Sequence, residues 1–192
     1  MGKRREIFKT NNGTVNLFYL HKNPDVSATL HCDKHVVKMI IEYAQMLSTA
    51  HRILDGTQYT DASSGRRIQR WRLDPDREDI LYKASHINHP STQWVRENKQ
   101  QYMYAYHMFV SLCNEYTHRY GKKHLTDTKL REILYYSPDN ITLGEWKEPP
   151  QCMPDDVKVE NDSLSAYHKY YAVYKKDFAK WTKREVPQFM SM

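Results

Sequence analysis

The sequence is poor in glycine and cysteine and has no long apolar run. Six glycines in 192 residues, without a GxGxxG or GxxxxGKS/T pattern, argue against a glycine-rich phosphate loop. The three cysteines, Cys32, Cys113 and Cys152, form no CxxC pair, which argues against a disulfide framework and a four-cysteine zinc site. No stretch approaches the roughly 18–20 apolar residues of a membrane span, and the N-terminus lacks the apolar core of a signal peptide. These absences predict a soluble, cytoplasmic protein without a membrane segment.

Basic and aromatic residues, in contrast, are abundant. Lys and Arg number 29 against 23 Asp and Glu, a net charge of +6, which suits a polyanionic partner such as nucleic acid. The aromatic fraction of 12% is too high for a disordered chain. A length of 192 residues fits one domain.

The pattern along the chain predicts a mostly α protein. Residues 1–15 form a basic, polar segment, predicted to be a flexible arm, and residues 16–192 are predicted to be a single compact helical domain. Apolar periodicity and capping signals predict five or six helices and at most one short strand. The expected helices span residues 23–54 (with a possible break at Asp33), 79–87, 91–120, 127–136 and 163–183. Residues 55–79 are predicted to be a functional loop because they carry an arginine cluster and few apolar side chains.

The segment from His31 to Thr49 carries the strongest chemical signal. On a helix, one broad face is apolar (Val36, Val37, Ile40, Ile41 and Ala44), and a polar stripe recurs at i, i+4, i+7 and i+11 (His31, His35, Lys38, Glu42, Gln45 and Thr49). Glu42 lies one turn from Lys38, so the carboxylate could orient or deprotonate the amine, as imine-forming or acid–base chemistry requires. A solvent-exposed ion pair on a polar face would give the same pattern.

Two further segments could bind phosphate or nucleic acid. Ser91 is predicted to cap the 91–120 helix, whose free N–H groups would bind an anion together with His89 and Arg96 and converge with His35 and Lys38 on one pocket. An ordinary loop-to-helix junction explains that pattern equally well. The run Lys169, Tyr170 and Tyr171 interleaves basic and aromatic residues, as nucleic-acid binding requires, but a docked amphipathic helix would look the same.

The overall pattern (NLFYL, HCDKHVVKMIIEYAQ, HP…W…RE, CMPDDVK and KW…R…P) is similar to that of a group of uncharacterised tailed-phage proteins. Two short segments resemble the phage pyrimidine-dimer DNA glycosylases/AP lyases, which are small, basic, all-α repair enzymes without a cofactor. Asp33, His35 and Glu42 match in order and spacing their Asp-x-His and catalytic Glu, and Lys169-Tyr170-Tyr171 is similar to their C-terminal aromatic run.

The resemblance implies an enzyme without a cofactor that acts on damaged or modified duplex DNA, in an infected bacterial host cell if the protein is phage-encoded. The catalytic residues would be Glu42, Lys38 and His35. Glu42 would be the general base and stabilise positive charge at the sugar, and Lys38 is a candidate amine. The residues expected to contact phosphate or sugar are His31, His35, Arg66, Arg67, Arg70, His89, Ser91, Arg96, Lys169, Tyr170 and Tyr171.

The sequence departs from that family at its N-terminus. The family uses the amine of an N-terminal Thr as nucleophile, whereas residues 1–15 precede the equivalent segment here and Asn16 stands in the place of that Thr. Processing could expose another amine, such as that of Gly2, or Lys38 could substitute. Two other functions stay open: a non-catalytic nucleic-acid or host-protein binding module, and a metal-dependent hydrolase or base-modifying enzyme that uses His31, His35 and His89.

Overall fold

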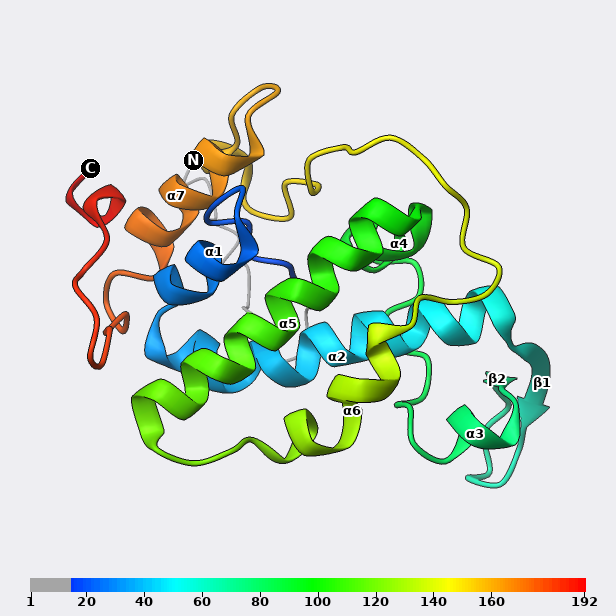
Figure 1. Cartoon of the computed structure of the whole chain (residues 1–192). Coiled ribbons are helices and arrows are strands. Elements are labelled where there is room, and N and C mark those ends of the chain that lie inside the picture. The colour runs from blue at the N-terminus through cyan, green and yellow to red at the C-terminus, as the bar shows by residue number, and fades with distance from the viewer. Residues whose placement is uncertain (1–14) are drawn as a thin grey trace.

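Two long helices, α2 (Asp33–Asp55) and α5 (Lys99–Tyr120), pack against each other at the centre of the molecule (Figure 1). The structure is a computed structural model that describes residues 15–192. The other α-helices are α1 (Pro24–Leu30), α3 (Pro75–Glu78), α4 (Pro90–Glu97), α6 (Leu125–Tyr135) and α7 (Ser163–Tyr174). Two short 3₁₀ helices, η1 (Asp155–Val157) and η2 (Gln188–Ser191), complete the helical elements of this range.

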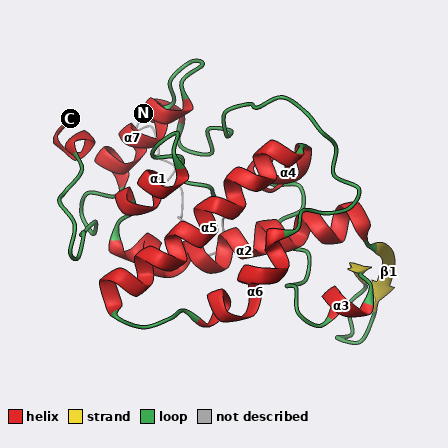
Figure 2. Ribbon diagram, in the orientation of Figure 1, coloured by secondary structure: helices red, strands yellow, loops and turns green. Residues whose placement is uncertain are grey.

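The prediction of a mostly helical single domain is confirmed, with more elements than expected. Residues 15–192 contain seven α-helices, and they contain a hairpin of two strands, β1 (Thr57–Asp61) and β2 (Ile68–Arg72), instead of at most one strand (Figure 2). The strands pair antiparallel, from Thr57 opposite Arg72 to Asp61 opposite Ile68. The hairpin occupies most of the predicted loop. Its strands were not predicted because this segment has few apolar residues.

Helix boundaries were predicted well where capping residues mark them. The break near Asp33 is confirmed: the Asn23 side chain accepts from the Asp25 amide and starts α1, and α2 begins at Asp33 and ends at Gly56. The predicted 91–120 helix is two helices, because Asn98 adopts an extended conformation between α4 and α5.

Two other helix predictions are wrong. Residues 79–87 are not helical, since this segment is bound through its backbone to side chains of α2 instead. The last long helix ends at Tyr174, well before Lys183. Beyond it the Lys180 carbonyl accepts from the Asp33 amide, and Thr182 donates to the Asp33 carboxylate. Tertiary contacts with the start of α2 therefore override the helical pattern.

The core is rich in tyrosine, and its buried hydroxyls have partners. Residues 15–20 enter it as a buried segment without regular secondary structure. Tyr43 and Tyr102 are each 0% exposed; the Tyr43 hydroxyl accepts from the Phe18 amide and that of Tyr102 donates to the Leu134 carbonyl. A ring that packs and a hydroxyl that finds an acceptor explain how so many tyrosines fit one core.

The first residue that the structure describes is part of the core. Val15, placed in the flexible arm by the sequence, is 2% exposed and belongs to the core. Residues 1–14 lie outside the described residues, so the rest of the predicted arm stays a prediction. Within residues 15–192, no helix has the length and apolar character needed to cross a membrane.

Candidate active site

Glu42 is a mostly buried carboxylate with an unsatisfied oxygen. The residue is 9% exposed. Its Oε1 lies 3.4 Å from the Lys38 ammonium, and its Oε2 is buried without a hydrogen-bond partner among residues 15–192. Burial raises the pKa of Glu42, while Lys38, the Asn16 backbone amide and His86 act to lower it. A carboxyl with a raised pKa beside an amine is suited to accept a proton and return it.

Lys38 provides an accessible amine beside this carboxylate. Its side chain is 46% exposed, whereas that of Glu42 is 12% exposed. The pair therefore lies at the protein surface, with the carboxylate on the inner side and the amine on the outer side. The predicted turn-to-turn contact of the two residues is confirmed.

The entering chain and a distant loop close the site around Glu42. The Asn16 side chain donates to the Cys152 carbonyl at 2.9 Å and accepts from the Tyr167 hydroxyl at 3.0 Å. These bonds hold Asn16 in place. Its backbone amide faces Glu42 and acts to lower the pKa of that carboxyl group. Segments far apart in sequence thus meet at one carboxylate with a shifted pKa, and shifted pKa values cluster at functional sites.

Residues 71–89, here called the return segment, lead from the hairpin back to the site. They are bound to the same face of α2 as Lys38 and Glu42, because Thr49 and Arg52 continue the stripe at i+11 and i+14 from Lys38. Thr49 Oγ1 accepts from the Ser85 amide at 3.1 Å. His86, the next residue, has a φ of +48°. A non-glycine residue rarely adopts this conformation, and such strain is common at functional sites.

His89, not Ser91, caps α4. The His89 Nδ1 accepts from the Ser91 amide at 3.1 Å, and burial lowers the pKa of His89, which favours the neutral acceptor. Ser91 is 0% exposed and its hydroxyl lies 3.4 Å from the Cys152 sulfur. The predicted capping and phosphate contact of Ser91 are therefore wrong, since its side chain is enclosed beside Cys152.

The two histidines at the start of the stripe are structural in this fold. His31 is 0% exposed; its ring nitrogens lie 2.7 Å from the Ser27 carbonyl and 2.7 Å from the Tyr43 hydroxyl, and burial lowers its pKa to about 4. The predicted contact of His31 with phosphate is therefore wrong, because its ring is enclosed and both ring nitrogens are bonded within the protein. His35 is 5% exposed, stacks on Phe18 at 4.2 Å and bonds the Tyr171 hydroxyl. It can act on the site only by positioning its neighbours.

The C-terminal aromatic run divides between core and surface. Tyr171 is 0% exposed, with its hydroxyl on His35 and the Cys32 amide, so its predicted contact with nucleic acid is wrong. Lys169 is exposed. Tyr170 is partly exposed; burial raises its pKa and the charge of Lys38 lowers it. Tyr170 therefore belongs to the surroundings of Lys38, as a nucleic-acid contact would require.

The predicted arginines lie in two other places. Arg66 and Arg67 are exposed at the tip of the hairpin, while Arg70 lies 3.6 Å from Asp61 on the paired strand. Arg96 is partly buried and donates to the Ile87 carbonyl at 2.8 Å. Burial lowers the pKa of Arg96. Arg96 thus holds the return segment next to His86, and its predicted contact with phosphate stays a prediction.

The stripe does not form a metal site. Residues 15–192 contain no group of three or more His, Cys, Asp or Glu side chains placed to hold an ion. The hypothesis of a metal centre on His31, His35 and His89 has no ligand set to support it, because hydrogen bonds within the protein occupy both ring nitrogens of His31.

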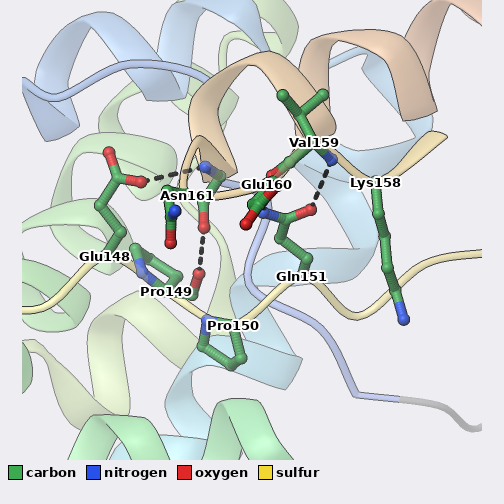
Figure 3. A pocket seen from close by; sticks show the side chains of 9 residues that line it. Glu148, Pro149, Pro150, Gln151, Lys158, Val159, Glu160 and Asn161 are labelled. Carbon is green, nitrogen blue, oxygen red and sulfur yellow. Dashed lines mark hydrogen bonds between the residues drawn. The ribbon is translucent and has the colours of Figure 1, made fainter. Parts of the chain in front are cut away.

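A wide hollow of about 810 Å³ opens elsewhere, between residues 148–151 and 158–163 (Figure 3). The residues that line it include none of the predicted site residues. Its lining has two carboxylates, Glu148 and Glu160, against one ammonium group, Lys158, and this net negative charge does not favour phosphate. The volume of a cavity therefore does not locate the chemistry in this protein.

Comparison with known families identifies one family. The profile of a family described as pyrimidine dimer DNA glycosylase matches residues 15–128, which is more than half of the chain. This protein belongs to that family. Searches of curated proteins and of solved structures gave no match. The family match starts at the buried entering segment and includes Asn16, Lys38 and Glu42.

Membership confirms the family that the stripe and its spacing resembled. The C-terminal run Lys169-Tyr170-Tyr171 lies outside the matched residues, so the family match does not bear on it, and phage origin and cytoplasmic location stay predictions. The sequence did not predict that the segments of Cys152 and His86 lie beside Glu42, because long-range bonds from Asn16 and Thr49 place them there.

Proposed function

We propose that this protein is a DNA glycosylase with AP-lyase activity that removes pyrimidine dimers or similarly damaged bases from duplex DNA. The observation that carries the proposal is Glu42: a mostly buried carboxylate with a free oxygen, beside an exposed amine. Family membership supports the reaction class. The net charge of +6 supports a polyanionic substrate.

The proposed chemistry uses one amine and one carboxyl group. The neutral amine attacks C1′ of the damaged nucleotide, and the base leaves with the electrons of the C1′–N bond and takes up a proton from water. The nitrogen then forms an imine as the C1′–O4′ bond opens. Glu42 would accept the proton lost by the nitrogen and return it to O4′, which suits its raised pKa. Loss of a C2′ proton then releases the 3′ phosphate.

The amine can be assigned in two ways. Lys38 is an accessible amine within 3.4 Å of the carboxylate. The Asn16 nitrogen also faces Glu42, but it is joined to Val15 in a peptide bond and has no nucleophilic lone pair. Cleavage of that bond would convert it into an amine at the same place. Gly2, the other candidate, lies outside the described residues.

Borohydride trapping tests the proposal. Duplexes with one thymine dimer or one abasic site should give a covalent protein–DNA adduct with the wild type, and Glu42→Gln should slow adduct formation by about 100-fold or more. Peptide mapping of the adduct would place the imine on Lys38 or on a processed N-terminus. Lys34→Ala, which removes a neighbouring exposed lysine of α2, should trap like the wild type.

A non-catalytic nucleic-acid binding module is the second candidate, favoured by the exposed arginines of the hairpin tip. It predicts salt-dependent affinity for DNA that Glu42→Gln does not change. Absence of any adduct on both duplexes, together with unchanged binding by Glu42→Gln, would reject the glycosylase and support the binding module.

A further inference from the structure

The hairpin carries its unpaired charge at an exposed tip. Residues 62–67 connect β1 to β2 and are all exposed. Arg66 and Arg67 form no ion pair with any group of residues 15–192, whereas Arg70 lies near Asp61 and Arg72 stacks 4.4 Å from the Tyr59 ring. Two adjacent guanidinium groups are therefore free to meet a ligand. On the flanking strands, the exposed Gln58 and Gln69 side chains are joined by a hydrogen bond of 3.2 Å.

The root of the hairpin is rigidly joined to α2. The Arg52 guanidinium, 3% exposed, donates to the Trp71 carbonyl and to the Glu78 carboxylate, both at 2.8 Å. Gly56 permits the close turn, since a Cβ there would lie 2.4 Å from the Arg52 carbonyl oxygen. The hairpin should therefore move with α2 as one body.

The hairpin and the active site share one side of α2. Arg52, which binds the hairpin root, lies on the helical stripe of Lys38 and Glu42. The rise from Glu42 to Gly56, at 1.5 Å per residue, is about 21 Å. α2 leads from the α1 and α7 end of the molecule to the hairpin (Figure 1). A ligand long enough to span this length can contact both.

We propose that the β1–β2 hairpin, whose root lies about six base pairs to one side of the damaged nucleotide, inserts its Arg66–Arg67 tip into the major groove of duplex DNA on that side. This inference rests on the proposed function. About 21 Å along α2, from Glu42 to the hairpin root, corresponds to about six base pairs at 3.4 Å each. The strands β1 and β2 carry the tip away from that root, and a two-stranded ribbon fits the major groove. Arginine and glutamine side chains are the groups that bond base edges there. The substrate is then a pyrimidine dimer in DNA that is continuously double-stranded on the side of the dimer where the hairpin binds.

The test measures binding by the full-length Glu42→Gln protein, so that no turnover interferes. Its affinity is measured for duplexes with one thymine dimer, in which the 5′ flank or the 3′ flank is shortened from about 12 to about 4 base pairs. Shortening one flank should lower the affinity about tenfold, and shortening the other should not. Adding Arg66→Ala and Arg67→Ala should lower affinity for the long duplex by a similar factor and abolish the response to the flank.

Groove and charge controls sharpen the test. Methylation of guanine N7 within the sensitive flank should reduce binding unless Arg66 and Arg67 are replaced, because N7 lies in the major groove. Lys122→Ala with Lys123→Ala is the matched control, since it removes two exposed positive charges near the start of α6, away from the hairpin. The control variant should keep the dependence on one flank.

The outcomes separate this inference from the proposed function. Equal dependence on both flanks, insensitivity to N7 methylation, or wild-type binding by the Arg66/Arg67 variant would overturn the groove contact even when the protein traps an imine. If the starting protein neither prefers dimer-containing duplex nor traps an imine, the proposed function fails, and the inference about the damaged nucleotide fails with it.

Discussion

Replacing Arg52 by Met should destabilise the fold by about 2–4 kcal/mol. The guanidinium donates five bonds of 2.7–2.9 Å, four of them to the carbonyls of Trp71, Glu78, Leu81 and Tyr82. The thioether fills the aliphatic space but leaves these acceptors without donors. Breaking a buried ion pair costs about 3–5 kcal/mol, and we take a lower value because the Glu78 side chain is 28% exposed.

Thermal unfolding followed by circular dichroism measures this loss. At about 2–4 °C per kcal/mol for a chain of this size, the Tm should fall by about 4–16 °C. Arg66→Met, at the exposed hairpin tip, should change the unfolding free energy by less than about 0.5 kcal/mol. If Arg52→Met is as stable as the Arg66→Met control, the bonds between α2 and the return segment do not hold the fold together, and the rigid coupling of hairpin and helix is refuted.

Two further predictions concern acid stability and the turn after α2. Burial lowers the pKa values of His31 and His51 to about 4, so the unfolded chain binds more protons than the folded one between about pH 6.5 and 4, and stability should be lost as the pH falls through this window. Each histidine should account for about 3 kcal/mol of the stability lost by pH 4. Urea unfolding from pH 7 to 4 would show this loss, and an unfolding free energy that does not change with pH would contradict it. Gly56→Ala should destabilise the fold by about 1–3 kcal/mol, because the added Cβ overpacks against the Arg52 carbonyl. Gly65→Ala should destabilise it by about 1–2 kcal/mol, because Gly65 has open space around it but a φ of +79°. Equal Tm values for Gly56→Ala and wild type would disprove the close contact.

Local signals carried the parts of the fold that were predicted correctly. Asn23 and Pro24 fix the start of α1, Asp33 fixes the break before α2, and Gly56 fixes its end, because each acts on backbone groups within one turn. The spacing of Lys38 and Glu42 on α2 likewise depends only on helical geometry. These features could be derived from the sequence since they require no knowledge of distant contacts.

The remaining features depend on contacts between distant residues. His31 and His35 share the stripe of Glu42, yet both are buried, and Tyr171, 136 residues from His35, closes over the ring. The same stripe places Thr49 and Arg52 against the return segment, which suppresses the predicted helix at residues 79–87. Periodicity shows which side chains share a face but does not show what covers that face.

Anchoring of the hairpin on the helical stripe that carries Glu42 makes the length of α2 a fixed spacing with a fixed phase. One residue inserted between Glu42 and Arg52 would rotate the two ends by about 100° and separate the carboxylate from the face that holds the return segment. Seven inserted residues would restore the phase to within about 20° while lengthening the helix by about 10.5 Å, or about three base pairs of duplex. Relatives that keep this arrangement are therefore expected to tolerate changes in the length of this part of α2 only in steps that restore the helical phase.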